Sequence, residues 1–486
     1  MKKSKQAETI VVGGGSAGCA IAGKLAAAGK EVLLIEAGPD YGRLGNSTWP
    51  PELVDARMLA TTHDWNHAGG RWEFQRARVI GGCSSHNGAI AAVGHRKDYD
   101  AWALPGWSGD DVAPLFDEVI KRMCVRTYTN DEAGPFHSRC LQAAKSLGWN
   151  MANDLCDLDA NDAFGLETVN IVGTTRWNTA FAYLDPERDN NNLSVVDETL
   201  IDRIECVDDW VRIIGTHQNL PVEFECQKLV LTAGVYGTPQ ILQRSGIGDP
   251  SLLKALNIEV VVDAQAVGQN LHDHSMCHAD RRVGPTLQKW LDEAAAAGFL
   301  PEEQTLGKAI SSQAEDGLYD LHMFPVCASD QTSFLHGRVH VEVACMTPKS
   351  RGHINITSND PSAQPDIDHA YLTDAEDHDI KVMSDGLKMA EEMLDHPILA
   401  EILEEPISDT STWAAIREQV EHYYHPVGTC RMGLDNDAVC DVNGHVNGLN
   451  NVIVGDASLM PQIPRGNTNL PAIMIGERIA KMMLLN

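Results

Sequence analysis

A glycine-rich turn between two apolar runs constrains the fold of this chain more than any other feature. Residues 10–12 (Ile-Val-Val) indicate a buried parallel strand, and glycines at 13, 15 and 18 follow in the pattern G-x-G-x-x-G. Residues 17–28 are rich in small helix formers and predict a helix, and residues 31–36 predict a second buried strand that ends in an acid. This order of elements is typical of a dinucleotide-binding βαβ unit.

Each residue of this turn has a physical role. Gly13 permits the tight turn, Gly15 and Ser16 bring the backbone close to a pyrophosphate, and Gly18 lets the helix pack against the sheet. The start of the helix offers free N–H groups and the positive end of its dipole to the phosphates. Glu36 lies where an acid binds the ribose. The motif alone does not distinguish FAD from NAD, and a glycine-rich turn in another α/β unit is the weaker interpretation.

Length and charge limit the classes of protein. A chain of 486 residues predicts two or more cores. The net charge of −30 excludes nucleic acid and anionic membranes as favourable partners, and no run of 18 apolar residues predicts a membrane span. Twelve singly placed cysteines and a start without a signal-peptide pattern predict free thiols in the cytoplasm. The 19 histidines show no metal-ligand spacing, so no metal site is predicted.

A second glycine-rich stretch, residues 78–88 (Arg-Val-Ile-Gly-Gly-Cys-Ser-Ser-His-Asn-Gly), lets the backbone approach a flat ligand. Residues 77–88 resemble the first signature of the glucose–methanol–choline (GMC) flavin oxidoreductases, in the version of the bacterial choline oxidases. The resemblance implies FAD as cofactor. In choline oxidases the His of this motif, here His86, is bonded covalently to the flavin, whereas many family members bind FAD non-covalently, so both modes stay open. The implied cofactor contacts are Arg78, Gly82, Ser85, His86 and Asn87.

The resemblance continues along the chain. Residues 237–248 are similar to the second signature of the family, and residues 423–433 and 452–471 are similar to its carboxy-terminal region. By position, Ile201 matches the backbone contact to adenine. Asp456, with Ala457, matches the acid near the ribityl and pyrophosphate groups, and a turn-forming Asp is the alternative. The resemblance covers most of residues 9–36, 77–126, 176–275 and 349–486.

The family implies an α/β fold with two parts. A Rossmann-like FAD-binding domain comprises residues 1–98, 190–275 and 426–486, and an α+β substrate domain built on an antiparallel sheet comprises residues 99–189 and 276–425. Residues 339–346 alternate as an antiparallel strand does. Residues 134–165 are expected to be rich in loops.

The chemistry follows from the same resemblance. Oxidation of CH–OH removes a proton from oxygen and a hydride from carbon, and a flavin accepts the hydride. The protein supplies a base near the hydroxyl, for which histidine is suited by its pKa of about 6.5. In GMC enzymes the His of the His-Pro-Val-Gly-Thr motif does this, and it falls on His425. The second residue of the pair falls on Asn469, which is expected to hydrogen-bond the substrate oxygen.

The substrate is predicted less sharply than the reaction. Gly307 and Lys308 stand where choline oxidases present an acid to the trimethylammonium group, and a positive Lys308 would oppose a cation. Residues 345–349 also lack the second active-site His of those enzymes. The middle region and the pair His425 and Asn469 resemble those of sugar and glycoside oxidases. Those enzymes oxidise a ring hydroxyl at C3 or C2, and this substrate class is favoured. Oxidation of choline-like, pyridoxine-like or aryl primary alcohols is the alternative.

Two other classes are weighed against an alcohol oxidase. A flavin-binding protein without catalysis is disfavoured because His425 and Asn469 are both present. An NAD-dependent dehydrogenase is disfavoured by residues 81–87 and by the carboxy-terminal region. The expected partners are a small alcohol or sugar and an electron acceptor, oxygen or another; neither the acceptor nor the oligomeric state can be read from the sequence.

Overall fold

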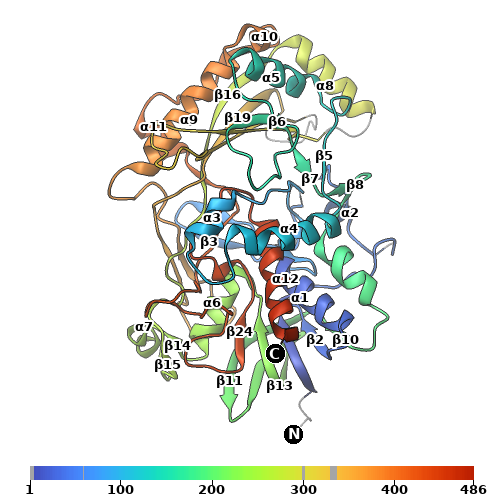
Figure 1. Cartoon of the computed structure of the whole chain (residues 1–486), viewed down its shortest axis with the longest axis vertical. Coiled ribbons are helices and arrows are strands. Elements are labelled where there is room, and N and C mark those ends of the chain that lie inside the picture. The colour runs from blue at the N-terminus through green and yellow to red at the C-terminus, as the bar shows by residue number, and fades with distance from the viewer. Residues whose placement is uncertain (1–4, 47, 59, 298–300, 329–335, 486) are drawn as a thin grey trace.

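The computed structural model describes residues 5–46, 48–58, 60–297, 301–328 and 336–485. Two sheets organise the chain, one in the lower and one in the upper half of Figure 1. The first sheet has the order β10-β2-β1-β13-β12-β11, and β24 also pairs with β13. Its strands are β1 (Lys5–Val12), β2 (Val32–Ile35), β10 (Leu193–Val196), β11 (Thr199–Val207), β12 (Trp210–His217), β13 (Leu220–Leu231) and β24 (Val452–Val454).

The strands of this sheet that surround the first glycine turn are parallel. Strand β1 pairs in parallel with β2 and β13, and β24 continues the parallel arrangement beyond β13. Strands β11 and β12 join β13 as an antiparallel extension. Helix α1 (Ser16–Ala27) crosses from β1 to β2, as the sequence predicts for a βαβ unit.

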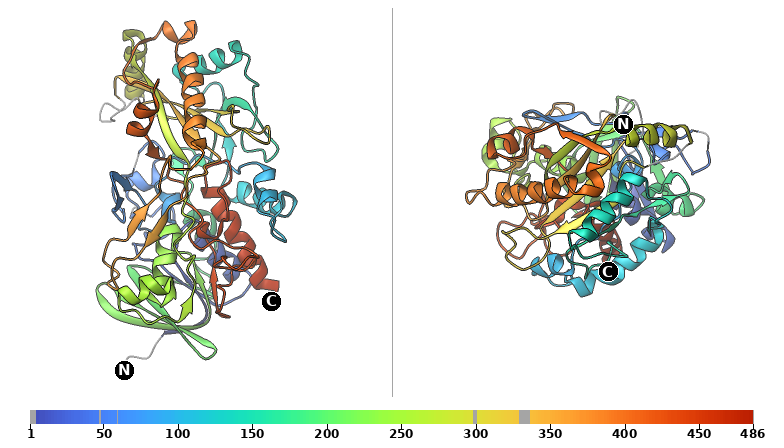
Figure 2. Two further views of the ribbon diagram at one scale, coloured as in Figure 1. Left: turned by 90° about the vertical axis from the view of Figure 1, so that its left-hand side faces the viewer. Right: turned by 90° about the horizontal axis from the view of Figure 1, so that it is seen from above.

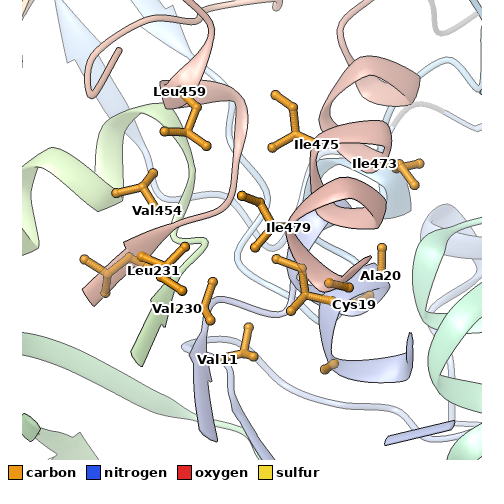
Figure 3. Packing of buried hydrophobic residues seen from close by; sticks show 14 of the residues in the cluster. Val11, Cys19, Ala20, Val230, Leu231, Val454, Leu459, Ile473, Ile475 and Ile479 are labelled. Atoms are coloured by element: carbon orange, nitrogen blue, oxygen red, sulfur yellow. The ribbon is translucent and has the colours of Figure 1, made fainter. Parts of the chain in front are cut away.

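The core of this first part joins the two ends of the chain. Helix α12 (Asn469–Leu485) packs against α1, and both cover the parallel strands. Figure 3 shows Val11, Cys19, Val230, Val454 and Ile479 converging from β1, α1, β13, β24 and α12. Burial of these aliphatic side chains fixes the start of α12, and therefore Asn469, beside the first glycine turn.

The second sheet is antiparallel and has the order β22-β16-β19-β18-β17-β6, with β23 paired to β16. One of its faces is covered by helices, and Figure 2 shows α9 alongside the sheet. The strands are β6 (Ala163–Leu166), β16 (Ser275–Val283), β17 (Thr305–Ala309), β18 (Leu321–Cys327), β19 (Arg338–Cys345), β22 (Leu403–Pro406) and β23 (Glu421–His422). The helices of this part include α5 (Pro135–Ser146), α8 (Pro285–Ala297), α9 (His378–Leu394), α10 (Pro397–Ala400) and α11 (Trp413–Gln419).

Alternation along these strands separates two apolar clusters. Leu321 and Val343 belong to the cluster that includes residues of the covering helices, whereas Phe324 and Ala344 belong to a different cluster that contains Tyr423. Because side chains alternate between the faces of a strand, the second group points away from the helices. This face approaches His425, so the sheet supplies the walls of the candidate site.

The structure confirms the predicted fold class and adds two details. Residues 134–165 were expected to be loop-rich, and this is wrong for α5, whose apolar residues Phe136, Cys140 and Ala144 recur at helical spacing and pack in the core. Helix α4 (Gly109–Arg122) lies in the second domain by the predicted boundaries, yet its Phe116 packs in the first core. The domain boundaries themselves stay a prediction.

All 12 cysteines are free thiols. Among the described residues, no helix combines the length and the hydrophobicity that a membrane span requires.

Candidate active site

The first glycine turn has space for a ligand at one position and none at the others. Gly13 has φ +105°, and a Cβ there would overlap the carbonyl of Thr232. A Cβ at Gly18 would overlap the carbonyl oxygen of Gly13. By contrast, the nearest atom to a Cβ built on Gly15 is 3.9 Å away. The roles predicted for the three glycines therefore match their surroundings, with an open approach at Gly15 and tight packing at Gly13 and Gly18.

The second glycine stretch lies against the first. Gly82 has φ +52°, and a Cβ there would be 2.7 Å from the Cα of Gly15. Ser85 and the preceding residues form the 3₁₀ turn η1 (Gly82–Ser85), and the Ser85 hydroxyl donates to the carbonyl of Ile80. His86 ends this turn half-buried, and Asn87 follows with its side-chain oxygen accepting from the Ala89 N–H. The two predicted cofactor loops therefore form one surface.

Glu36 follows β2, as expected for the ribose-binding acid. Its two carboxylate oxygens accept from the backbone N–H groups of Gly14 and Gly38, each at 2.8 Å. Burial raises the pKa of Glu36 to about 7, opposed by these hydrogen bonds. Arg78 lies beside this corner, where its Nε donates to the carbonyl of Ala37.

Three further residues are expected at the cofactor: Ile201 on the edge strand β11 of the first sheet, and Asp456 and Ala457, which follow β24. Ile201 is buried on β11, next to an irregularity in its pairing with β12. Asp456 accepts from the N–H of Gly234 and the hydroxyl of Thr238, and it caps the turn η4 (Ala457–Leu459), in which Ala457 is the first residue. Asp456 thus forms a turn and also connects that turn to α6 (Gly234–Arg244).

Asn469 opens α12 and contacts the first glycine turn directly. Its Oδ1 accepts from the hydroxyl of Ser16 at 2.8 Å, although the two residues lie at opposite ends of the chain. Its Nδ2 is buried without a hydrogen-bond partner. A buried amide donor without a partner is costly, so this N–H group is available to a bound molecule.

His425 is held from two sides. Its backbone N–H donates to Oδ1 of Asp273 at 2.9 Å, and its Nδ1 lies 3.2 Å from Nδ1 of His274. Asp273 in turn accepts from the Tyr371 hydroxyl at 2.8 Å. Burial, together with the neighbouring His274, His322 and Arg76, lowers the pKa of His425 well below its ordinary value. The imidazole is therefore neutral at pH 7, which is the state that a proton acceptor needs.

Three carboxyl groups act on Tyr423, whose ring packs against this base. The rings of Tyr423 and His425 are 4.6 Å apart between centroids, and the pKa of Tyr423 is raised by burial and by Glu342, Glu303 and Glu167. Glu167 is 1% exposed, and neither of its carboxylate oxygens has a hydrogen-bond partner. We call Glu167, Glu303 and Glu342 the carboxyl cluster.

The carboxyl cluster borders the second glycine stretch as well. Gly88 follows His86 by two residues, and a Cβ built on Gly88 would be 3.5 Å from Oε2 of Glu303. Burial and the other two carboxyl groups raise the pKa of Glu167 well above its ordinary value, and burial and Glu342 also raise the pKa of Glu303. Mutual repulsion in a dry site makes this cluster receptive to a positive charge.

Lys308 does not neutralise the carboxyl cluster. Its Nζ donates to the carbonyl of Leu155 at 2.9 Å and lies 4.8 Å from the ring centroid of Tyr319. Burial lowers the pKa of Lys308 to about 8, opposed by Cys156 and Asp98. The charges that act on Glu167 are those of the other two carboxyl groups. Lys308 also lowers the pKa of His322, one of the groups near His425, so the expectation that it opposes a cation in the site stays a prediction.

The comparisons with known proteins agree with this architecture. Two family models described as GMC oxidoreductase match residues 7–276 and 348–476. The chain belongs to the GMC oxidoreductase family. GMC oxidoreductases bind FAD, and this protein is accordingly an FAD-dependent oxidoreductase that acts on CH–OH donors. The resemblance to this family that residues 77–88 carry is confirmed, as is FAD as the cofactor.

Relatives in this family include proteins named oxygen-dependent choline dehydrogenase. The protein from Pseudomonas syringae pv. tomato is 32% identical over 99% of this chain and 94% of its own length. The protein from Klebsiella pneumoniae is 32% identical over 98% of this chain and 95% of its own length. Similar solved structures include pyridoxine 4-oxidase from Mesorbium loti, with a TM-score of 0.86 at 24% identity over 99% of both chains. Formate oxidase from Aspergillus oryzae has a TM-score of 0.87 at 22% identity over 100% and 99% of the two chains.

The residues of the site fit FAD. The open approach at Gly15, the unpartnered amide of Asn469 and the contact between the two glycine stretches are features that a bound dinucleotide would use. The predictions for individual residues at the cofactor stay predictions. The sequence analysis missed Glu167, Glu303 and Glu342, because they come from separate segments and no spacing along the chain connects them.

Proposed function

We propose that this protein oxidises a small primary alcohol that carries a positive charge, a choline-like amino alcohol. The observation that carries this proposal is Glu167, a buried carboxyl group without a hydrogen-bond partner beside two other carboxyl groups. A buried acid in this state is costly unless a ligand compensates it. A cationic group would also gain from the ring of Tyr423, which packs against His425 and whose pKa the carboxyl cluster raises.

In this proposal His425 accepts the proton of the substrate hydroxyl. When Nδ1 of His425 donates to Nδ1 of His274, Nε2 keeps its lone pair for that proton. Bound FAD would supply the redox chemistry as the acceptor of the hydride from the carbinol carbon. Asn469 is held at the first glycine turn by the Ser16 hydroxyl, so its unpartnered Nδ2 would donate to the cofactor there.

The attachment of the cofactor is part of the proposal. We infer that His86 is the residue bonded covalently to the flavin, because it lies half-buried at the end of η1, on the surface formed by the two glycine stretches. The names of the choline dehydrogenases support the substrate class. The sugar or glycoside substrate favoured by the sequence analysis is the competing candidate, supported by the His425 and Asn469 pair.

A comparison of matched substrates tests the proposal. Anaerobic flavin reduction is followed by stopped-flow absorbance with choline and with 3,3-dimethylbutan-1-ol, in which carbon replaces the charged nitrogen. We expect choline to give the higher kcat/KM, and this advantage to grow as the pH rises and the carboxyl cluster ionises. Equal values for the two alcohols, or faster reduction by pyranosides than by either, would refute the charged-substrate proposal in favour of a neutral or sugar substrate.

A further inference from the structure

Three potential metal ligands meet behind the second sheet, away from the carboxyl cluster. They are Cys345, the last residue of β19, and His378 and Asp379, the first two residues of α9. One ligand atom from each lies within 4.8 Å of the others. Their exposed fractions are 0%, 7% and 1%. This group was invisible to an analysis of spacing, because Cys345 is far from the other two along the chain.

The hydrogen bonding of the group leaves room for an ion. Nε2 of His378 is buried and has no partner, which costs free energy unless something binds there. The oxygens of Asp379 accept from the backbone N–H groups of Lys349 at 2.7 Å and Ser350 at 3.0 Å. These bonds fix the carboxylate and leave its remaining lone pairs free, as the outer hydrogen bonds of metal sites do.

The electrostatic surroundings favour a cation. Burial raises the pKa of the Cys345 thiol well above its ordinary value, and Asp379, Asp320 and Asp374 raise it further. The thiol therefore lies near three carboxylates, of which Asp379 also interacts with the guanidinium of Arg351. A divalent cation would reverse this balance, because a metal-bound thiol is deprotonated.

We propose that Cys345, His378 and Asp379 bind one zinc ion, with water as the fourth ligand. Sulfur, imidazole and carboxylate together select Zn²⁺ over Mg²⁺ or Ca²⁺, which prefer oxygen alone. Zinc–ligand bonds of about 2.0–2.3 Å place tetrahedral ligands about 3.5 Å apart. The group needs to contract from at most 4.8 Å, which is by about 1.3 Å at most, to reach this spacing. Binding of Zn²⁺ by the thiol, neutral imidazole and carboxylate releases one proton, from the thiol.

The role of this ion is structural. Cys345 belongs to the apolar cluster on the helix-covered face of the sheet, whereas Ala344 beside it belongs to the cluster that contains Tyr423. The ion would connect the end of β19 to the start of α9, and through Asp379 to the segment that contains Lys349 and Ser350. It would support the sheet behind the active site without touching substrate.

Metal analysis of the FAD-loaded protein tests this site. The protein is stripped with a chelator, reloaded with Zn²⁺, dialysed and measured by plasma mass spectrometry. We expect one zinc per chain, and loss of zinc in C345S and H378N. C327S is the matched control, because Cys327 is also buried in the same cluster, on the neighbouring strand β18. Less than 0.1 zinc per chain in the wild type, or equal zinc in wild type and both ligand variants, would overturn the proposal.

Cobalt gives a readout that does not depend on the folding of the variants. Co²⁺ bound to a thiolate in tetrahedral geometry shows a charge-transfer band in the near ultraviolet, which is measured as a difference against the flavin spectrum of the same sample. We expect this band in wild type and C327S. A Co²⁺ complex without the band would show an adventitious ion only and would exclude Cys345 as a ligand. Flavin reduction by substrate is expected to persist after chelation, while the melting temperature falls.

Discussion

Replacement of Glu167 by Gln tests two effects of the carboxyl cluster, on the stability of the fold and on the binding of a cation. Glutamine has the same shape but cannot ionise, so E167Q removes a group that can become negative near Tyr423, without opening a cavity. Because Glu167 is buried with a raised pKa, its folded form holds a proton more tightly than the unfolded chain. As pH rises from the unfolded pKa towards the folded one, wild type loses about 1.4 kcal/mol of stability per pH unit. E167Q does not lose stability in this way, because glutamine does not titrate.

The same substitution weakens binding of a cation. A unit charge about 5 Å from a carboxylate gains about 3 kcal/mol at an effective dielectric constant of about 20. This gain is an upper bound, because part of it is spent on removing the proton that Glu167 holds in the free enzyme, and about 3 kcal/mol corresponds to about a 150-fold change in binding. E167Q is therefore expected to be more stable than wild type and to bind a cationic alcohol more weakly, by about 150-fold at most.

Two measurements check this prediction. Thermal unfolding of wild type and E167Q is compared at pH 5 and pH 7.5, and the gain in melting temperature of E167Q is expected to be larger at pH 7.5. The Kd for choline is measured from the dependence of anaerobic flavin reduction on its concentration, with 3,3-dimethylbutan-1-ol as the neutral control. If E167Q weakened both alcohols equally, or lost stability at pH 7.5, Glu167 would be a structural residue and the reasoning would be wrong.

Four further predictions address the cofactor and the base. His425→Ala should slow flavin reduction by about 10²–10⁴-fold with FAD still bound, and near-normal reduction in stopped-flow would refute its role as base. His274→Ala should raise the pH at which kcat/KM reaches its plateau, because a neighbour that lowers the pKa of His425 is removed; an unchanged pH profile contradicts this. Acid precipitation should give a yellow pellet from wild type and a colourless one from His86→Asn, whereas a colourless wild-type pellet excludes covalent attachment. Gly15→Ala should fold without FAD, while Gly18→Ala should fail to fold, as judged by circular dichroism and flavin absorbance; retention of FAD by Gly15→Ala contradicts the phosphate role.

The sequence by itself predicted the fold class from a local signal, and it predicted FAD from the family resemblance that residues 77–88 carry. The strand, the glycines at 13, 15 and 18, the helix and Glu36 lie within one short stretch, and the structure builds the expected βαβ unit from them. A turn that needs φ +105° at Gly13 can be recognised from neighbouring residues alone.

Only the tertiary structure decided which distant side chains share a site. The hydrogen bond from Ser16 to Asn469 depends on the packing of α12 against α1. The carboxyl cluster exists because separate segments bring Glu167, Glu303 and Glu342 towards one ring, and a one-residue slip on β19 would turn Glu342 to the helices. Pairing register and helix packing are set by burial of apolar surface across the whole chain, so no local pattern of residues records them.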